Sequence, residues 1–177
     1  MRQVFGQSKR LTLQASIQVR YLHISISDQT LSAFEDQQKV FEFSVSTALN
    51  GHGCEQGSGK TPVGKHYIRA KIGGSEPLNA VFVARRATGE IYSEKLAQQF
   101  PKRDWILSRI LWLCGQELGV NRLGGVDSMA RYIYIHGTPD SEPMGVPKSH
   151  GCVRMRNTDV VILFDWVPVG CPVMIEV

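Results

Sequence analysis

The stretch Ser149-His150-Gly151-Cys152-Val153-Arg154-Met155 decides how this chain is interpreted, together with the upstream His136. Cys152 follows one histidine by two positions and lies between a glycine and the short apolar Val153. Most cysteines are buried packing residues, but a core cysteine rarely occupies a polar turn that contains glycine. The stretch therefore indicates either a nucleophilic thiol or a packing cysteine in an unusually polar turn.

The segments around this stretch predict a strand, a loop and a short helix. Residues 131–136 are a strong strand that ends at His136, and residues 137–148 carry three prolines and must form a loop. After the cysteine, Asn157 is a candidate helix N-cap, and apolar residues recur at helical spacing until Pro168. Residues 171–177 predict a closing strand.

Further segments of the chain predict β-strands, some by alternation of apolar and polar residues and others as short apolar runs. The expected strands cover residues 11–19, 21–27, 30–34, 40–47, 65–71 and 80–84. Residues 105–114 are apolar on both parities and fit a buried strand or a helix, and the glycines that follow favour the strand. Residues 88–99 predict a short helix or irregular structure, and we expect residues 85–128 to form a wall or lid over a cleft. The whole pattern, residues 1–177, predicts one mostly β domain of mixed sheets with a short helix after the cysteine.

Composition excludes several classes of protein. The chain is 42% apolar and 20% charged with a formal net charge of +4, as in ordinary globular domains. Its basic residues are scattered, which argues against nucleic acid as a partner. No segment reaches the ~18 apolar residues of a membrane span. The glycine-rich residues 50–60 do not form a phosphate loop, because Cys54 stands where that motif needs glycine.

Cys152 is the candidate nucleophile and His136 the candidate base. A free thiol has a pKa of ~8.5, so a neighbouring imidazole that takes its proton, forming an ion pair, would activate it. The loop between the two residues is long enough to close on itself at modest entropic cost. A base also needs a partner on its other ring nitrogen, and a backbone carbonyl near Gly137 could supply it.

The remaining residues of the stretch suit acyl chemistry. An oxyanion needs donors, and the N–H groups of Gly151, Cys152 and Val153 are the natural supply. Ser149 could hold the turn through a hydrogen bond. Arg154 is placed to meet a carboxylate of an anionic substrate.

Other interpretations apply to the remaining cysteines and histidines. Cys54, Cys114 and Cys171 are expected to be packing residues. His52 is expected in a loop, and His23 and His66 on the surface of strands. A zinc site built from His136, His150 and Cys152 is conceivable, but it lacks the paired spacing of structural sites.

The quoted residues resemble a known family. His136-Gly137-Thr138 followed by Ser149-His150-Gly151-Cys152-Val153-Arg154-Met155-Arg156-Asn157 is similar to the active-site signature of the L,D-transpeptidase catalytic domain, also called the YkuD family. The resemblance extends over the opening strands, Thr61-Pro62-Val63-Gly64 and Val169-Gly170-Cys171-Pro172-Val173. It covers the chain from about residue 20 to the end.

The resemblance implies a mostly β catalytic domain that forms a thioester on Cys152, with His136 as base and the Gly137 carbonyl as its orienting partner. Ser149, His150, Gly151 and Val153 would line the cysteine loop, and Arg154 would contact substrate. The implied substrate is a peptidoglycan stem peptide or muropeptide, cleaved at the L,D bond before the terminal D-alanine of a tetrapeptide. Neither a cofactor nor a metal is implied.

Three functions remain open at this point. The thioester could pass to an amine, giving an L,D-transpeptidase, or to water, giving an L,D-carboxypeptidase that acts on recycled muropeptides. A non-catalytic muropeptide-binding module is the third. If the N-terminus is native, the lack of a signal peptide pattern predicts a cytoplasmic protein; a trimmed sequence would fit a periplasmic or wall-associated one. The oligomeric state has no sequence signal.

Overall fold

The structure is a computed structural model and describes residues 18–177. Its strands are β1 (Arg20–Ser25), β2 (Thr30–Glu35), β3 (Gln38–Ser44), β4 (Gly64–Ile72), β5 (Ala80–Val83), β6 (Arg86–Ile91), β7 (Ile106–Gly115), β8 (Tyr134–Gly137), β9 (Val153–Met155) and β10 (Pro172–Glu176). The helices are α1 (Glu94–Gln99) and α2 (Asn157–Trp166), with a 3-10 turn at Gly124–Val126. This confirms the mostly β fold with a short helix after the cysteine.

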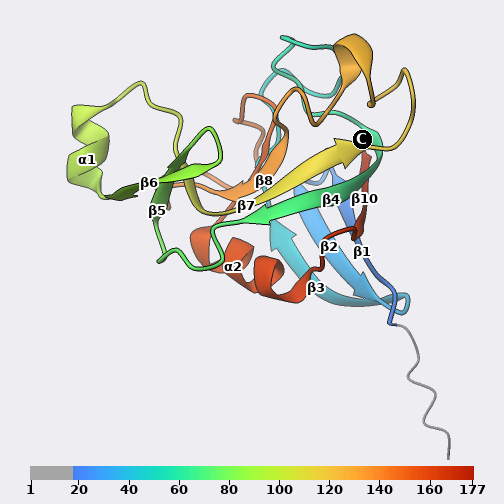
Figure 1. The fold of residues 1–177 in the computed structure, drawn as a ribbon, viewed down its shortest axis with the longest axis horizontal. Coiled ribbons are helices and arrows are strands. Elements are labelled where there is room, and N and C mark those ends of the chain that lie inside the picture. Colours follow the sequence, from blue (N-terminus) through green and yellow to red (C-terminus); the bar gives the residue numbers. More distant parts are fainter. Residues whose placement is uncertain (1–17) are drawn as a thin grey trace, which may run out of the picture.

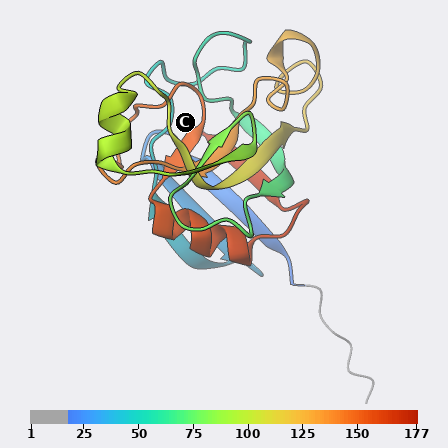
Figure 2. The same cartoon turned by 60° about the vertical axis from the view of Figure 1, so that its left-hand side comes forward.

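The strands form one mixed sheet with a branch. Their order is β3-β2-β1-β10-β4-β7-β5-β6, and β8 pairs with β7 and carries β9 on its other side. The pairs β1–β10 and β8–β9 are parallel, and the other pairs are antiparallel. Helix α2 lies below the strands, and α1 lies at the far end from β1–β3 (Figures 1 and 2).

The main core lies between α2 and the sheet. Its buried side chains come from β1, β2, the central strands and the helix, and include Leu22, Leu31, Leu111, Ile135, Met155, Leu163 and Ile175. Burying each such aliphatic side chain contributes roughly 1.5–3 kcal/mol relative to exposure. The core therefore fixes β8 and β9, which carry the residues on either side of the candidate site.

Parallel pairing of β8 with β9 brings the two predicted catalytic residues onto one face. The register sets Ile135 opposite Val153 and His136 opposite Arg154. Because side chains alternate along a strand, Ile135 and Val153 enter the core while His136 and Arg154 face the other way. Cys152 directly precedes β9 and so has the parity of Arg154.

The predicted strand at residues 131–136 begins three residues later than expected. Residues 127–132 form turns in which the Asp127 carboxylate accepts the N–H groups of Leu123 and Ala130 at 2.7 and 2.9 Å. Tyr132 has a φ of 58°, which is unfavourable in a strand. These turn contacts outweigh the strand propensity of the alternating sequence.

Two further predictions need correction. Asn157 is the first residue of α2, not its N-cap; Arg156 is the N-cap, and its side chain makes no capping hydrogen bond. His66 is fully buried, whereas a surface position was expected. Its ring lies 3.0 Å from the Gly64 carbonyl and 2.9 Å from Ser128 Oγ, so both of its nitrogens are satisfied inside the protein.

The uncertain segment 85–128 resolves into β6, α1, β7 and loops. Ser93 Oγ caps α1 by accepting the Leu96 N–H at 3.2 Å. Strand β7 confirms the buried-strand prediction for residues 105–114 and pairs with β4, β5 and β8. The strand expected at residues 11–19 lies outside the described residues, except for 18 and 19, which precede β1. Among the described helices, neither is long and apolar enough to cross a membrane.

Candidate active site

His136 and Cys152 line the same cavity, whose volume is about 440 Å³. Tyr134 and Arg154, which share their strand face, line it as well. From strand spacing and rise, Cα atoms diagonally opposed in this way lie about 8 Å apart. Both residues therefore face the same cavity.

The imidazole of His136 is held in one tautomer. The residue is 1% exposed, and its Nδ1 lies 2.8 Å from the Gly137 carbonyl. A carbonyl only accepts, so Nδ1 carries the proton and the lone pair is on Nε2. Burial lowers the pKa of His136 to about 4, although the Gly137 carbonyl acts to raise it. The ring is therefore neutral near pH 7 and able to accept a proton at Nε2.

Cys152 is a partly exposed residue whose side chain packs against a buried cluster and receives one backbone hydrogen bond. The Tyr134 N–H donates to Sγ at 3.4 Å, and Sγ lies 3.5 Å from the Tyr132 carbonyl. Burial raises the pKa of Cys152 to about 12, and the Tyr134 N–H only partly offsets this effect. Both pKa shifts favour the neutral thiol and the neutral imidazole in the resting site.

The turn before the cysteine is held by two hydroxyl groups. Ser149 Oγ accepts the Gly151 N–H at 3.2 Å and donates to the Cys152 carbonyl at 2.5 Å. Thr61 Oγ1 donates to the Gly151 carbonyl at 3.0 Å. Gly151 has a φ of 135°, which favours glycine. Its N–H is already bound by Ser149, and Val153 pairs with Ile135 in the β8–β9 ladder, so of the three predicted oxyanion donors only the Cys152 N–H is not engaged in these contacts.

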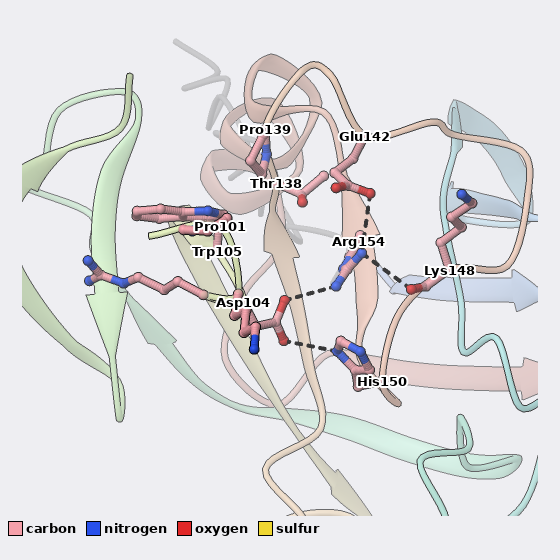
Figure 3. Close-up of a pocket in the computed structure, with 11 residues that line it drawn as sticks. Pro101, Asp104, Trp105, Thr138, Pro139, Glu142, Lys148, His150 and Arg154 are labelled. Atoms are coloured by element: carbon pink, nitrogen blue, oxygen red, sulfur yellow. Dashed lines mark hydrogen bonds and ion pairs between the residues drawn. The ribbon is translucent and has the colours of Figure 1, made fainter. Parts of the chain in front are cut away.

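Arg154 is buried and engaged by two carboxylates. Its guanidinium lies 2.8 Å from Asp104 and 3.6 Å from Glu142, and it donates to the Lys148 carbonyl at 3.4 Å (Figure 3). His150 Nδ1 lies 3.4 Å from the other oxygen of Asp104. The predicted carboxylate-binding arginine is therefore already paired within the protein.

The carboxylate of Asp104 joins these side chains. Burial raises the pKa of Asp104, but the combined effect of the nearby Arg154, His136 and His150 is larger and lowers it. The net shift is therefore downward. Asp104, Arg154 and His150 also line a second cavity of about 350 Å³, on the side of Pro139 and Glu142 (Figure 3). These three side chains form the shared wall of the two cavities.

Three residues that line the cavity with Cys152 and His136 were not predicted from the sequence. Asp104 lies two residues before β7, and its charge at that boundary was the only available signal. Tyr134 has the same strand parity as His136, which could have indicated its position. Arg85 donates to Tyr134 Oη at 2.9 Å and stacks over Trp112, a long-range contact that has no local signal.

The other cysteines and possible metal ligands lie apart from this chemistry. Cys54, Cys114 and Cys171 are buried and unpaired by disulfides, as expected of packing residues. Across residues 18–177, no three His, Cys, Asp or Glu side chains gather in a group that could hold a metal ion.

Comparison with known proteins gives consistent matches. The profile of the family "YkuD: L,D-transpeptidase catalytic domain" matches residues 19–175. "Probable L,D-transpeptidase YbiS" of Escherichia coli K12 is 50% identical over 42 residues, which are 24% of this chain and 14% of that protein. "Probable L,D-transpeptidase ErfK/SrfK" of Salmonella typhimurium is 47% identical over 47 residues, 27% of this chain and 15% of that protein.

A solved structure shows the same fold. L,D-transpeptidase 3 from Mycobacterium tuberculosis, in complex with a faropenem-derived adduct, aligns with a TM-score of 0.55 at 15% identity. The alignment covers 90% of this chain and 61% of that one. Each match thus spans less than two thirds of the relative's own length. Because the family profile covers almost all of the described residues, this chain belongs to the L,D-transpeptidase catalytic domain family.

Proposed function

We propose that this chain is a cysteine acyl transferase that acts on the L,D bond of peptidoglycan tetrapeptide stems through a thioester on Cys152. The observation that carries the proposal is the cavity that Cys152 and His136 share. The proton of the neutral His136 ring is on Nδ1, which faces the Gly137 carbonyl, so Nε2 is free to act as a base. Membership of the L,D-transpeptidase family supports the substrate class.

The acylation step follows from these positions. Sγ of Cys152 attacks the carbonyl carbon of the residue before the terminal D-alanine, and its proton passes to Nε2 of His136. The tetrahedral oxyanion would be stabilised by the backbone N–H of Cys152. As the intermediate collapses, the C–N bond breaks, and the imidazolium returns the proton to the leaving D-alanine nitrogen. The products are free D-alanine and a thioester.

Neutral resting groups suit this sequence of events. A thiol with a pKa of about 12 is protected from random electrophiles, and the proton leaves only as the carbon–sulfur bond forms. A histidine with a pKa of about 4 would remain available as a base throughout the neutral range. The Gly137 carbonyl stabilises the imidazolium once it forms, because it accepts a hydrogen bond from the Nδ1–H group.

The second step releases the acyl group. An acceptor amine attacks the thioester carbon, loses its proton to His136, and the thiolate leaves and is reprotonated. The two cavities on either side of Asp104, His150 and Arg154 favour an amine over water, because a second peptide would have a site of its own. Hydrolysis by the same residues would give an L,D-carboxypeptidase.

Product analysis tests the proposal. Purified protein is incubated with a synthetic tetrapeptide stem, with and without an amine acceptor, and the products are weighed by mass spectrometry. We expect release of D-alanine and formation of a crosslinked product, both absent in Cys152→Ala and unchanged in Cys114→Ala. Tripeptide alone, with acceptor present, would support the carboxypeptidase. Retained turnover in Cys152→Ala would contradict both activities.

A further inference from the structure

The backbone that follows His136 is held from two directions. The Gly137 carbonyl accepts a hydrogen bond from the Nδ1–H of His136. The N–H of the same peptide unit belongs to Thr138 and donates to the Met155 carbonyl at 3.1 Å. Any rotation of this peptide would move the carbonyl away from the ring. The orientation of His136 therefore depends on what fixes residues 137 and 138.

Asn157 contacts both of these residues from below. It is 2% exposed, and its Nδ2 donates to the Thr138 carbonyl at 2.7 Å. A Cβ added to Gly137 would lie 2.4 Å from Asn157 Oδ1, so the amide packs directly against the glycine backbone. As the first residue of α2, Asn157 thus connects the helix to the end of β8.

Ser108 sets the orientation of that amide. It is fully buried, and its Oγ donates to Asn157 Oδ1 at 2.6 Å while accepting the Asn79 N–H at 3.0 Å. Its φ is 64°, an unfavourable value for a residue with a side chain. It lies where the pairing of β7 with β8 shifts between Leu107 and Ile110. This bulge turns the hydroxyl toward Asn157, and such strain often marks functional sites.

We infer that Ser108 and Asn157 are positioning residues for His136. The hydrogen bonds from Ser108 to Asn157 and from Asn157 to Thr138 hold the Gly137 carbonyl where it fixes the imidazole. Neither side chain lines the two cavities at the active site, so both act through the backbone. The inference rests on the proposed function, because it takes His136 to be the base.

Two variants separate positioning from folding. Ser108→Gly removes the hydroxyl but also removes the strain, since glycine accepts a positive φ. Asn157→Asp keeps the shape and places an acid in the first turn of α2, where the helix dipole favours it. It replaces the donor that faces Thr138 with an acceptor. Thr158→Ala, an exposed neighbour on the same helix, is the matched control.

The experiment measures kcat and KM on a tetrapeptide stem and the NMR signal of the His136 Nδ1 proton. We expect kcat to fall about tenfold to a hundredfold in Ser108→Gly and Asn157→Asp, with KM within twofold, because small misplacements of a catalytic group reduce the rate by such factors. The proton signal should broaden or exchange faster in both variants. Thr158→Ala should match the wild type in every readout.

Two results have different meanings. If both variants keep the wild-type kcat and a slowly exchanging Nδ1 proton while His136→Ala is inactive, Ser108 and Asn157 do not position the base, and the inference is wrong. If His136→Ala itself retains full activity, the proposed function fails. The NMR signal then still reports whether Ser108 and Asn157 hold the ring.

Discussion

The pH dependence of Cys152 reactivity is the most direct consequence of the site's electrostatics. Burial raises the pKa of its thiol from 9.0 to about 12, against the effect of the Tyr134 N–H. Three units correspond to about 4 kcal/mol favouring the neutral thiol. At pH 8 the thiolate fraction should be about a thousandfold smaller than for an ordinary cysteine of pKa 9.

Alkylation by iodoacetamide, followed by peptide mapping, measures this difference. The rate at Cys152 is recorded from pH 6 to 11 in the folded protein and in the same protein unfolded in guanidinium chloride. We expect the folded rate to rise about tenfold per pH unit through pH 10 and to stay far below the unfolded rate. A plateau between pH 6 and 8 would show a preformed thiolate–imidazolium pair, and the reasoning that burial outweighs the amide hydrogen bond would be refuted.

Three further predictions concern stability, each measured by urea unfolding. Burial lowers the pKa of His136 from 6.5 to about 4, so protonation of this ring opposes folding. The free energy of unfolding should therefore fall by about 3 kcal/mol as pH drops from 6.5 to 4. If a His136→Gln variant shows the same loss, the loss does not come from His136. Asp104→Asn removes a charged partner of the buried Arg154 guanidinium, and the Asp104 side chain is 47% exposed. We expect the free energy of unfolding to fall by about 1–2 kcal/mol. The control Asp140→Asn, at an exposed position, should change it by about zero. Gly137→Ala would place Cβ 2.4 Å from a buried amide oxygen and should cost about 1–3 kcal/mol, whereas Gly125→Ala has open space and should be tolerated; equal losses in the two would argue against the close packing.

Local sequence patterns were sufficient for most of the fold. Period-2 alternation located β1 and β4, other extended or apolar runs indicated β2, β3, β5 and β10, and the three prolines correctly excluded a helix between β8 and β9. The pairing order could not be predicted in the same way. Strand β7 is apolar on both faces because Leu111 and Leu113 enter the main core while Ile110 packs in a second buried cluster on the other face. Its sequence shows only that it is buried, not which strands it pairs with.

The site was predictable where neighbouring residues define it. Cys152, His136 and the Gly137 carbonyl were predicted from a short motif. Cys152 and His136 line one cavity and the carbonyl contacts the His136 ring, while their catalytic roles stay predictions. The long-range partners were not found, because Asp104 reaches the motif through tertiary contacts alone. The raised thiol pKa also escaped prediction, since it arises from burial in the assembled fold.

Ser108 illustrates a different limit. A serine in the middle of an apolar strand suggests no particular role, and its positive φ depends on a bulge set by two neighbouring strands. Its partner Asn157 was expected to cap the helix, a common use of asparagine. Instead, the side chain bonds the Thr138 carbonyl, because β8 ends directly above the first turn of α2.

Trapping the acyl-enzyme tests the central claim most directly. Protein mixed with an excess of tetrapeptide stem is quenched in acid within milliseconds to seconds, digested, and mapped by mass spectrometry. The account predicts that the tripeptide acyl group appears on Cys152, does so more slowly in His136→Ala, and disappears on treatment with hydroxylamine. Turnover of the stem with Cys152 unmodified at every time, or the acyl group on another residue, would contradict it.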